Sequence, residues 1–137
     1  PPMSPRVAAE MAATREKIRA NRQKVVASSM DLTAAENEKF WPLYREYRDS
    51  MGVLGDRWVK MVSDYAQVYS KLTDQQAIRF LTEYTKYDSD RIVLRTTYIR
   101  KFGAILPPRK VMRYFQIENK LDAIINYDLA GEIPLAK

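Results

Sequence analysis

Seven cations between residues 91 and 113 are the side chains with the clearest chemical potential in this sequence. No carboxylate interrupts the segment, which carries Arg91, Arg95, Arg100, Lys101, Arg109, Lys110 and Arg113. The 137-residue chain has a net charge of +6 and a pI near 9.6. A basic run of this kind is usually a solvated helix face, and it can also attract anionic groups on a partner. The sequence leaves both interpretations open.

Nucleic acid is one candidate partner for this basic segment. No zinc knuckle, RNP motif or basic-region zipper accompanies the charge, and residues 5–28 lack a convincing recognition pattern. We therefore keep an intracellular nucleic-acid-associated protein, using residues 91–113, as the alternative function.

Tyrosine and methionine supply a second kind of binding chemistry, with nine and six copies in the chain. Aromatic residues at helical spacing usually form a core, but a Tyr hydroxyl needs a partner, so we expect parts of this face to be half exposed. Met adapts its shape to different ligands. Together these side chains predict a polypeptide-binding surface made of Arg91, Arg95, Arg100, Lys101, Tyr44, Tyr47, Met51 and Met61.

Catalytic and cofactor chemistry has little support in this composition. Cys and His are both absent, which excludes disulfides, thiolate nucleophiles, Ser-His-Asp triads and zinc sites built on Cys or His. The four glycines form no phosphate-binding loop. Asp88 and Asp90 are not followed by the glycine and glutamate of an EF-hand loop, so we expect a solvated helix turn there. We predict a protein that is not an enzyme, with no cofactor and no metal site.

A repeated phrase, Leu-Thr-x-x-(Glu/Gln)-x-x-(Lys/Arg)-Phe, occurs at residues 32–40 and 72–80. In each copy the Thr can cap a helix, the Glu or Gln three residues later can complete a capping box, and the preceding Leu can act as a hydrophobic staple. A looser third copy at 106–114 has two prolines in place of the Thr. The predicted structural caps are Leu32, Thr33, Glu36, Leu72, Thr73 and Gln76.

These start signals predict four helices at about 5–28, 34–71, 74–105 and 108–129, followed by a tail at 130–137. No strand pattern competes, so the predicted fold class is all-α within a single domain. No run of eighteen uncharged apolar residues is present, and we expect no transmembrane segment.

The second and third predicted helices should pair as a long antiparallel hairpin. Apolar residues from Phe40 to Leu72 alternate steps of four and three, which is the 3.5-residue period of coiled-coil-like packing. Pro42, Gly52 and Gly55 lie inside this helix and predict that it is bent.

The apolar stripe of the second helix widens between residues 58 and 69, where Val59, Val62, Ala66 and Tyr69 join the seam. One antiparallel neighbour does not cover so wide a face. We expect a dimer partner or the first helix to supply a second contact there.

The two capping phrases resemble the L-T-x-x-Q motifs of the Spy/CpxP-type periplasmic proteins. Leu72-Thr73-Asp74-Gln75-Gln76 fits that motif, and Leu32-Thr33-Ala34-Ala35-Glu36 fits it with Glu for Gln. The resemblance covers the organisation of residues 30–105. It implies a periplasmic protein that forms a cradle-shaped helical dimer, holds unfolded or misfolded polypeptides without ATP, and restrains a membrane sensor protein. The zinc-responsive branch of the family uses histidines, so the resemblance carries no metal site to this chain.

We therefore expect an exported helical homodimer that binds unfolded or partner polypeptides, as an ATP-independent chaperone or a modulator of envelope stress. The opening "PPMSPRV" is expected to be either a trimmed start or a mature form whose export signal has been removed. Two further functions stay open, a purely structural helical adaptor and, last, an unrecognised hydrolase.

Overall fold

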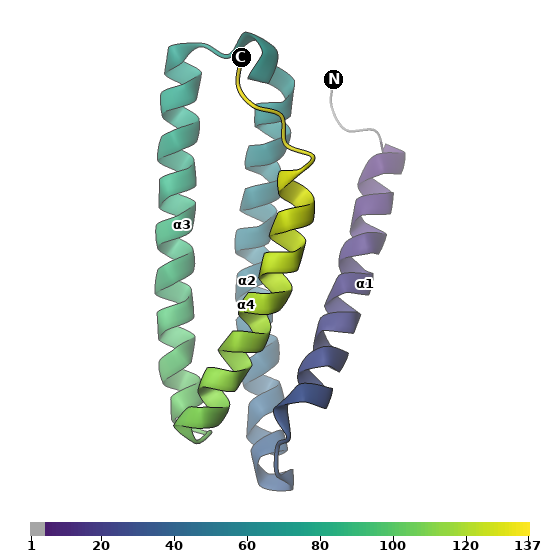
Figure 1. The fold of residues 1–137 in the computed structure, drawn as a ribbon, viewed down its shortest axis with the longest axis vertical. Helices are drawn as coiled ribbons and strands as arrows, with labels where there is room; N and C mark the ends of the chain where they lie inside the picture. The colour runs from purple at the N-terminus through teal and green to yellow at the C-terminus, as the bar shows by residue number, and fades with distance from the viewer. Residues whose placement is uncertain (1–4) are drawn as a thin grey trace.

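Four α-helices and one short 3-10 turn make up the described part of the protein, residues 5–137 of a computed structural model (Figure 1). The elements are α1 (Pro5–Met30), α2 (Ala34–Val68), η1 (Tyr69–Lys71), α3 (Asp74–Gly103) and α4 (Pro108–Ala130). The all-α class is confirmed, and the described residues contain no strand. Helix starts coincide with the predicted positions, and the largest difference at a helix end is three residues, where α2 tightens into η1.

Both copies of the repeated phrase form capping boxes. The Thr33 hydroxyl accepts a hydrogen bond from the Glu36 N–H at 3.2 Å, and the Glu36 carboxylate accepts one from the Thr33 N–H at 2.9 Å. Thr73 and Gln76 repeat this exchange at 3.1 and 3.0 Å. The third copy works differently, because Pro107 occupies the N-cap position of α4 without a side-chain hydrogen bond. Proline starts that helix through its fixed backbone angle.

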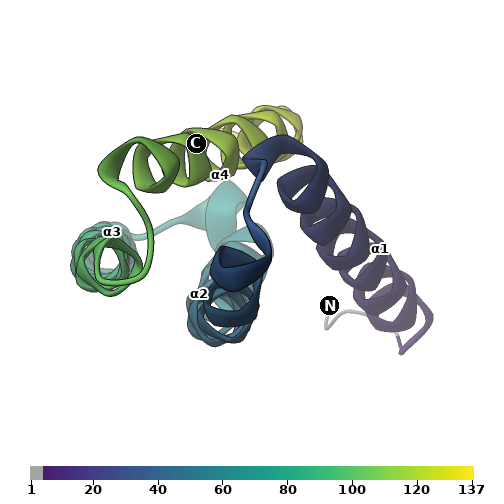
Figure 2. The same cartoon turned by 90° about the horizontal axis from the view of Figure 1, so that it is seen from below.

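The helices α2 and α3 run side by side in opposite directions and are joined through η1 (Figure 1). Their aromatic side chains meet along the contact: the Trp58 ring lies 5.6 Å from the Tyr87 ring, and the Tyr65 ring lies 5.8 Å from the Phe80 ring. The helix α2 continues through Pro42 as one element. The helix α4 lies across one side of the α2–α3 pair and packs against α1 and α3 (Figure 2).

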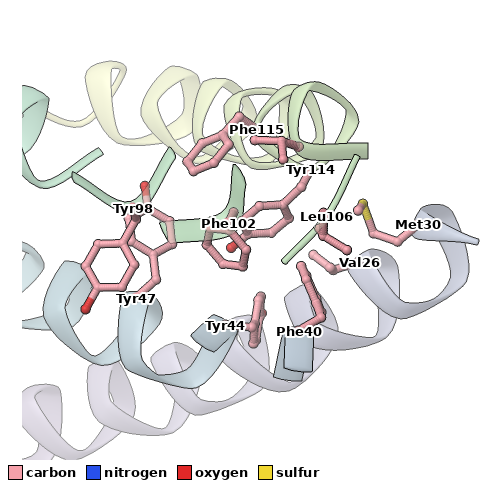
Figure 3. Close-up of a cluster of buried hydrophobic side chains, with 11 residues drawn as sticks. Val26, Met30, Phe40, Tyr44, Tyr47, Tyr98, Phe102, Leu106, Tyr114 and Phe115 are labelled. Carbon is pink, nitrogen blue, oxygen red and sulfur yellow. The ribbon is translucent and has the colours of Figure 1, made fainter. Parts of the chain in front are cut away.

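The closed core lies at the end of the molecule where α1 and α3 finish and α2 and α4 begin, and we call it the packed end (Figure 3). The Phe102 ring lies 5.5 Å from the Phe40 ring and 4.8 Å from the Tyr114 ring, so α2, α3 and α4 all meet at this point. The buried residues here are Val26, Met30, Phe40, Tyr44, Tyr47, Tyr98, Phe102, Leu106, Val111, Tyr114 and Phe115.

The opposite half of the α2–α3 pair, residues 55–68 and 74–94, is the open end. None of these residues is fully buried. The widened stripe of α2 finds a second contact within the chain, because the C-terminal tail crosses it: the Tyr65 hydroxyl donates to the Pro134 carbonyl at 2.7 Å. This contact comes from the tail and not from the first helix.

No helix within residues 5–137 combines the length and the apolar character needed to cross a bilayer. The opening residues 1–4, to which part of the export expectation refers, lie outside the described residues.

Candidate functional site

The structure buries two of the predicted surface residues, Tyr44 and Tyr47, and that prediction is wrong. Each side chain is only 3% exposed. Their cover comes from α4, whose Tyr114 ring lies 6.0 Å from Tyr44 and whose Phe115 ring lies 5.7 Å from Tyr47. Burial raises the pKa of both tyrosines to about 12. These rings stabilise the packed end and are not accessible to a ligand.

The two predicted methionines lie in different parts of the molecule. Met51 packs against the core of the packed end and is partly buried. Met61 lies in the open end and is also partly buried. Of the four apolar residues predicted for the surface, only Met61 lies in the open end.

Carboxylates from other helices hold two of the four predicted cations. Arg91 donates to Asp122 of α4 at 2.9 Å, and its side chain is 23% exposed. The Lys101 ammonium lies 3.0 Å from Glu46 of α2, and the hydrogen bond to Glu46 raises the pKa of Lys101. Both side chains therefore direct their charge to partners inside the molecule.

Two of the five remaining cations of the basic segment also have partners inside the molecule. Arg95 is partly buried and Arg100 is exposed. Lys110 forms an ion pair with Glu36 at 2.6 Å, and Arg113 donates to a backbone carbonyl of α1. The run of residues 91–113 has no carboxylate in the sequence, but folding brings carboxylates to it from α2 and α4.

A buried ion-pair network was missed by the sequence analysis. Glu118 of α4 is 2% exposed and accepts hydrogen bonds from Arg22, from Arg48 at 3.1 Å and from the Tyr114 hydroxyl at 3.0 Å. Arg22 also donates to Asp122 at 2.7 Å. Desolvation acts to lower the pKa of Arg22, but the two carboxylates outweigh it and the pKa is raised.

This network joins α1, α2, α3 and α4, since Arg91 of α3 reaches the same Asp122. Within the described residues, no buried side-chain nitrogen or oxygen lacks a hydrogen-bond partner. A saturated network of this kind holds the helices together and leaves no group free for a ligand. The signal that could have found it is the spacing of Glu118 and Asp122, one turn apart on the side of α4 that carries Tyr114.

The most distinctive exposed surface is the side of α3 that faces away from α2 and α4 (Figure 2). Ile78 is 65% exposed, Leu81 is 67% exposed and Ile92 is 51% exposed. Between residues 78 and 99 the residues on this side recur every three or four positions and include no charge, and the exposed Arg100 follows one turn after Thr96. We call the following set the α3 outer face: Ile78, Leu81, Thr82, Thr85, Ser89, Ile92, Val93, Thr96 and Ile99.

The threonines of the α3 outer face are less polar than their type suggests. The hydroxyls of Thr82, Thr85 and Thr96 each donate to the backbone carbonyl four residues earlier, at 2.8 to 2.9 Å. Because a hydroxyl has one hydrogen to donate, this local bond occupies it. The side chain can then turn its methyl group toward solvent, and the face becomes continuous with the exposed Ile and Leu side chains.

Charged residues border the α3 outer face on both sides. The exposed Asp88 lies on the edge that carries Leu81, and four other charged residues lie on the opposite edge. Along the chain they alternate in sign, as Arg79, Glu83, Lys86 and Asp90, and neighbours pair within the helix: Arg79 lies 3.9 Å from Glu83, and Lys86 lies 3.1 Å from Asp90. A shallow hollow between this border and the face is lined by Leu81, Thr82, Thr85, Lys86, Ser89 and Asp90.

Asp90 forms ion pairs with two cations. Besides Lys86, it accepts a hydrogen bond from Arg57 of α2 at 2.8 Å. These hydrogen bonds, first that of Arg57, lower the pKa of Asp90. Among the described residues, no group of three or more acidic side chains is placed to hold a metal ion.

Comparison of this chain with protein-family models, with curated proteins and with solved structures finds no match. The candidate site therefore rests on the geometry of the chain itself.

Proposed function

We propose that this protein binds apolar segments of other polypeptides and that the α3 outer face is the surface that holds them. One observation carries the proposal: a helix whose other side is packed presents an uncharged stripe about six turns long to solvent. On an amphipathic helix of a globular protein the side away from the core is normally charged or polar. A contiguous exposed apolar patch is typical of an interaction site.

The chemistry of the stripe suits polypeptide binding better than binding of a compact ligand. Methyl groups of Ile, Leu, Val and Thr offer apolar contact without a fixed pattern of hydrogen bonds, so different sequences can occupy the same face. The adjacent hollow is shallow and open, whereas small-molecule sites are usually enclosed. The charged border could speed encounter with a client through long-range attraction.

The resemblance to the Spy/CpxP-type proteins supports the wider proposal of an exported, periplasmic, ATP-independent chaperone or envelope-stress modulator. In this proposal the α2–α3 pair is the long hairpin of a cradle-like homodimer, and a membrane sensor protein is a second partner. Both L-T-x-x-(Glu/Gln) phrases would serve that architecture as helix caps and not as contacts to the client.

The proposal is tested by following the aggregation of reduced insulin in the absence of nucleotide. Several-fold excess of the wild-type protein should delay aggregation. The double variant Leu81→Ser, Ile92→Ser should lose most of that delay, while the matched variant Val53→Ser, Ile124→Ser should keep it, because those side chains are similarly exposed on α2 and α4. Circular dichroism should report the same helicity for all three proteins.

The nucleic-acid alternative makes the opposite prediction. If the wild-type protein gives no protection at several-fold excess and instead binds single- or double-stranded nucleic acid with a steep salt dependence, the chaperone proposal is wrong. Four of the seven cations in residues 91–113 already donate to acceptors within the chain, which weakens this alternative.

A further inference from the structure

The tail, residues 131–137, folds back along α2 and reaches η1 (Figure 1). Two hydrogen bonds hold it there. The Tyr65 hydroxyl donates to the Pro134 carbonyl at 2.7 Å, and the Lys137 N–H donates to the Tyr69 carbonyl at 3.4 Å. Residues 134–137 form no helix or turn. Both bonds use main-chain atoms of the tail, so α2 recognises the backbone of a non-helical segment here.

The surface of α2 under the tail is held in place by contacts other than those to the tail. The Tyr65 ring lies 6.1 Å from the Tyr69 ring and 5.8 Å from the Phe80 ring of α3, and these contacts position the Tyr65 hydroxyl. The Tyr69 carbonyl lies at the junction of α2 and η1. Helix ends offer carbonyls to donors from outside the helix. A donor and an acceptor one turn apart are therefore ready to meet an extended chain.

The tail itself is held weakly. Ile133 is partly buried, but every other residue of the tail is exposed, and Leu135 is 89% exposed. The contact therefore buries little apolar area, and the hydrogen bond from Lys137 is long. The covalent connection to α4 compensates, because a segment on a short tether has an effective concentration in the millimolar range. A tail held in this way can be displaced by a competing segment.

The residues at the centre of the tail suit this surface. The ring of Pro134 fixes φ, so the free tail has fewer conformations to give up when it binds. Proline also has no N–H, and only its carbonyl needs a partner, which Tyr65 supplies. Ile133, just before it, is the tail residue whose side chain is partly buried. An apolar residue followed by proline is therefore the pattern that fits this part of α2.

From these observations we infer that the end of α2 around Tyr65 and Tyr69 is a binding site for an extended segment with an apolar residue followed by proline. The tail occupies this site as an internal ligand, and a matching segment of another polypeptide displaces it. The inference does not rest on the proposed function, because the α3 outer face is the side of α3 that faces away from α2.

NMR titration of the isotope-labelled full chain with a synthetic peptide tests the inference. The peptide is Gly-Glu-Ile-Pro-Leu-Ala-Lys, the sequence of residues 131–137. It should shift the amide signals of Tyr69 and its neighbours in η1. The wild-type protein should bind it weakly, because its own tail competes. The double variant Ile133→Ser, Pro134→Gly loosens the tail and should bind the peptide about threefold more tightly. A peptide that carries the same two changes should bind to neither protein.

Tyr65→Phe, added to the double variant, removes only the hydroxyl and should weaken peptide binding about fivefold. Tyr127→Phe in the same background is the matched control, since Tyr127 is 83% exposed on α4, and it should leave binding unchanged. Circular dichroism should report the same helicity for all variants.

Three results would overturn the inference: a double variant that binds the peptide no more tightly than the wild type, peptide-induced shifts away from the end of α2, or equal losses for Tyr65→Phe and Tyr127→Phe. The variant Leu81→Ser, Ile92→Ser should bind the peptide like the wild type. A protein that binds the peptide as described but gives no protection against insulin aggregation would remove the proposed function alone.

Discussion

The packed end and the open end of this molecule are built from the same kind of sequence but reach different degrees of burial. Apolar residues follow each other at the same helical spacing along α2, from Phe40 in the packed end to Tyr65 in the open end. Phe40 is fully buried, whereas Trp58 and Tyr65 are only partly buried. The difference lies in the neighbours: four helices meet around Phe40, and mainly α3 and the C-terminal tail contact the residues of the open end.

Helical periodicity therefore predicts which residues share a face, but the number of elements that cover the face decides whether it becomes a core. At the packed end the rings exclude water on all sides and the ion pairs are buried. At the open end the same pair of helices keeps its outer side in solvent, which is the condition for binding another polypeptide.

Truncating one aromatic ring at each end gives the largest expected contrast. Phe40→Ala should lower the free energy of unfolding by about 3 to 5 kcal/mol, because it opens a cavity in the packed end. Phe80→Ala should cost much less, about 1 to 2 kcal/mol, because Phe80 is partly exposed and water can fill the space. Urea unfolding measures both, and equal losses would contradict the division into two ends.

Removing one carboxylate from each region compares their ion pairs. Glu118→Ala leaves Arg22 and Arg48 facing each other without their shared carboxylate, and should destabilise the fold by about 3 to 5 kcal/mol. Asp90→Ala removes a half-exposed partner of Arg57 and Lys86, and should cost less than about 1 kcal/mol. Thermal and urea unfolding should agree on this order, and a larger loss for Asp90→Ala would reverse it.

The two capping threonines allow a smaller comparison, since their local geometry is nearly the same. Thr33→Ala and Thr73→Ala should each lower the free energy of unfolding by about 1 kcal/mol, and the corresponding Gly variants should lower it by only a few tenths of that amount. Hydrogen exchange in the first turn of α2 and of α3 would show whether the loss stays local. Negligible and equal losses for Ala and Gly would mean that the repeated phrase has another purpose.

The smallest expected effect is a difference between the two capping boxes in how the free energy of unfolding depends on pH. The hydrogen bond from Lys110, and then that from the Thr33 backbone, lower the pKa of Glu36 below its ordinary value. A lowered folded-state pKa contributes stability at higher pH that is lost as pH falls through it. Glu36→Gln, which copies the second box, should therefore flatten the fall in stability on acidification below about pH 5. An unchanged slope in urea titrations would show that the Lys110 contact contributes nothing.

Much of this architecture could be predicted from the sequence because its signals are local. Capping boxes at Thr33 and Thr73 and the prolines at 107 and 108 depend on neighbouring residues only, and they mark the helix starts. The burial of Tyr44 and Tyr47 depends on where α4 packs, and no local pattern specifies that. The ion pairs of Arg91 with Asp122 and of Lys101 with Glu46 join residues far apart in the chain. The sequence pattern therefore overestimated how many cations of the basic segment are available to a partner.

The α3 outer face was missed for a related reason. Its residues share a stripe with no aromatic or basic side chain, and exposure of Ile78 or Leu81 can be seen only once the opposite side of α3 is packed. The hydrogen bonds of its threonines also depend on helix geometry, which hides their hydroxyls from a partner.

Methyl NMR tests the central claim, that the α3 outer face holds polypeptides, most directly. Protein labelled at Ile, Leu and Val methyl groups would be titrated with reduced insulin chains. Binding at this face should shift the methyl signals of Ile78, Leu81, Ile92 and Ile99, and the signals of Val53, Ile124 and the buried Val26 should stay unchanged. Shifts confined to Val53, Ile124 or the packed end, or no shifts at all at saturating client, would contradict it.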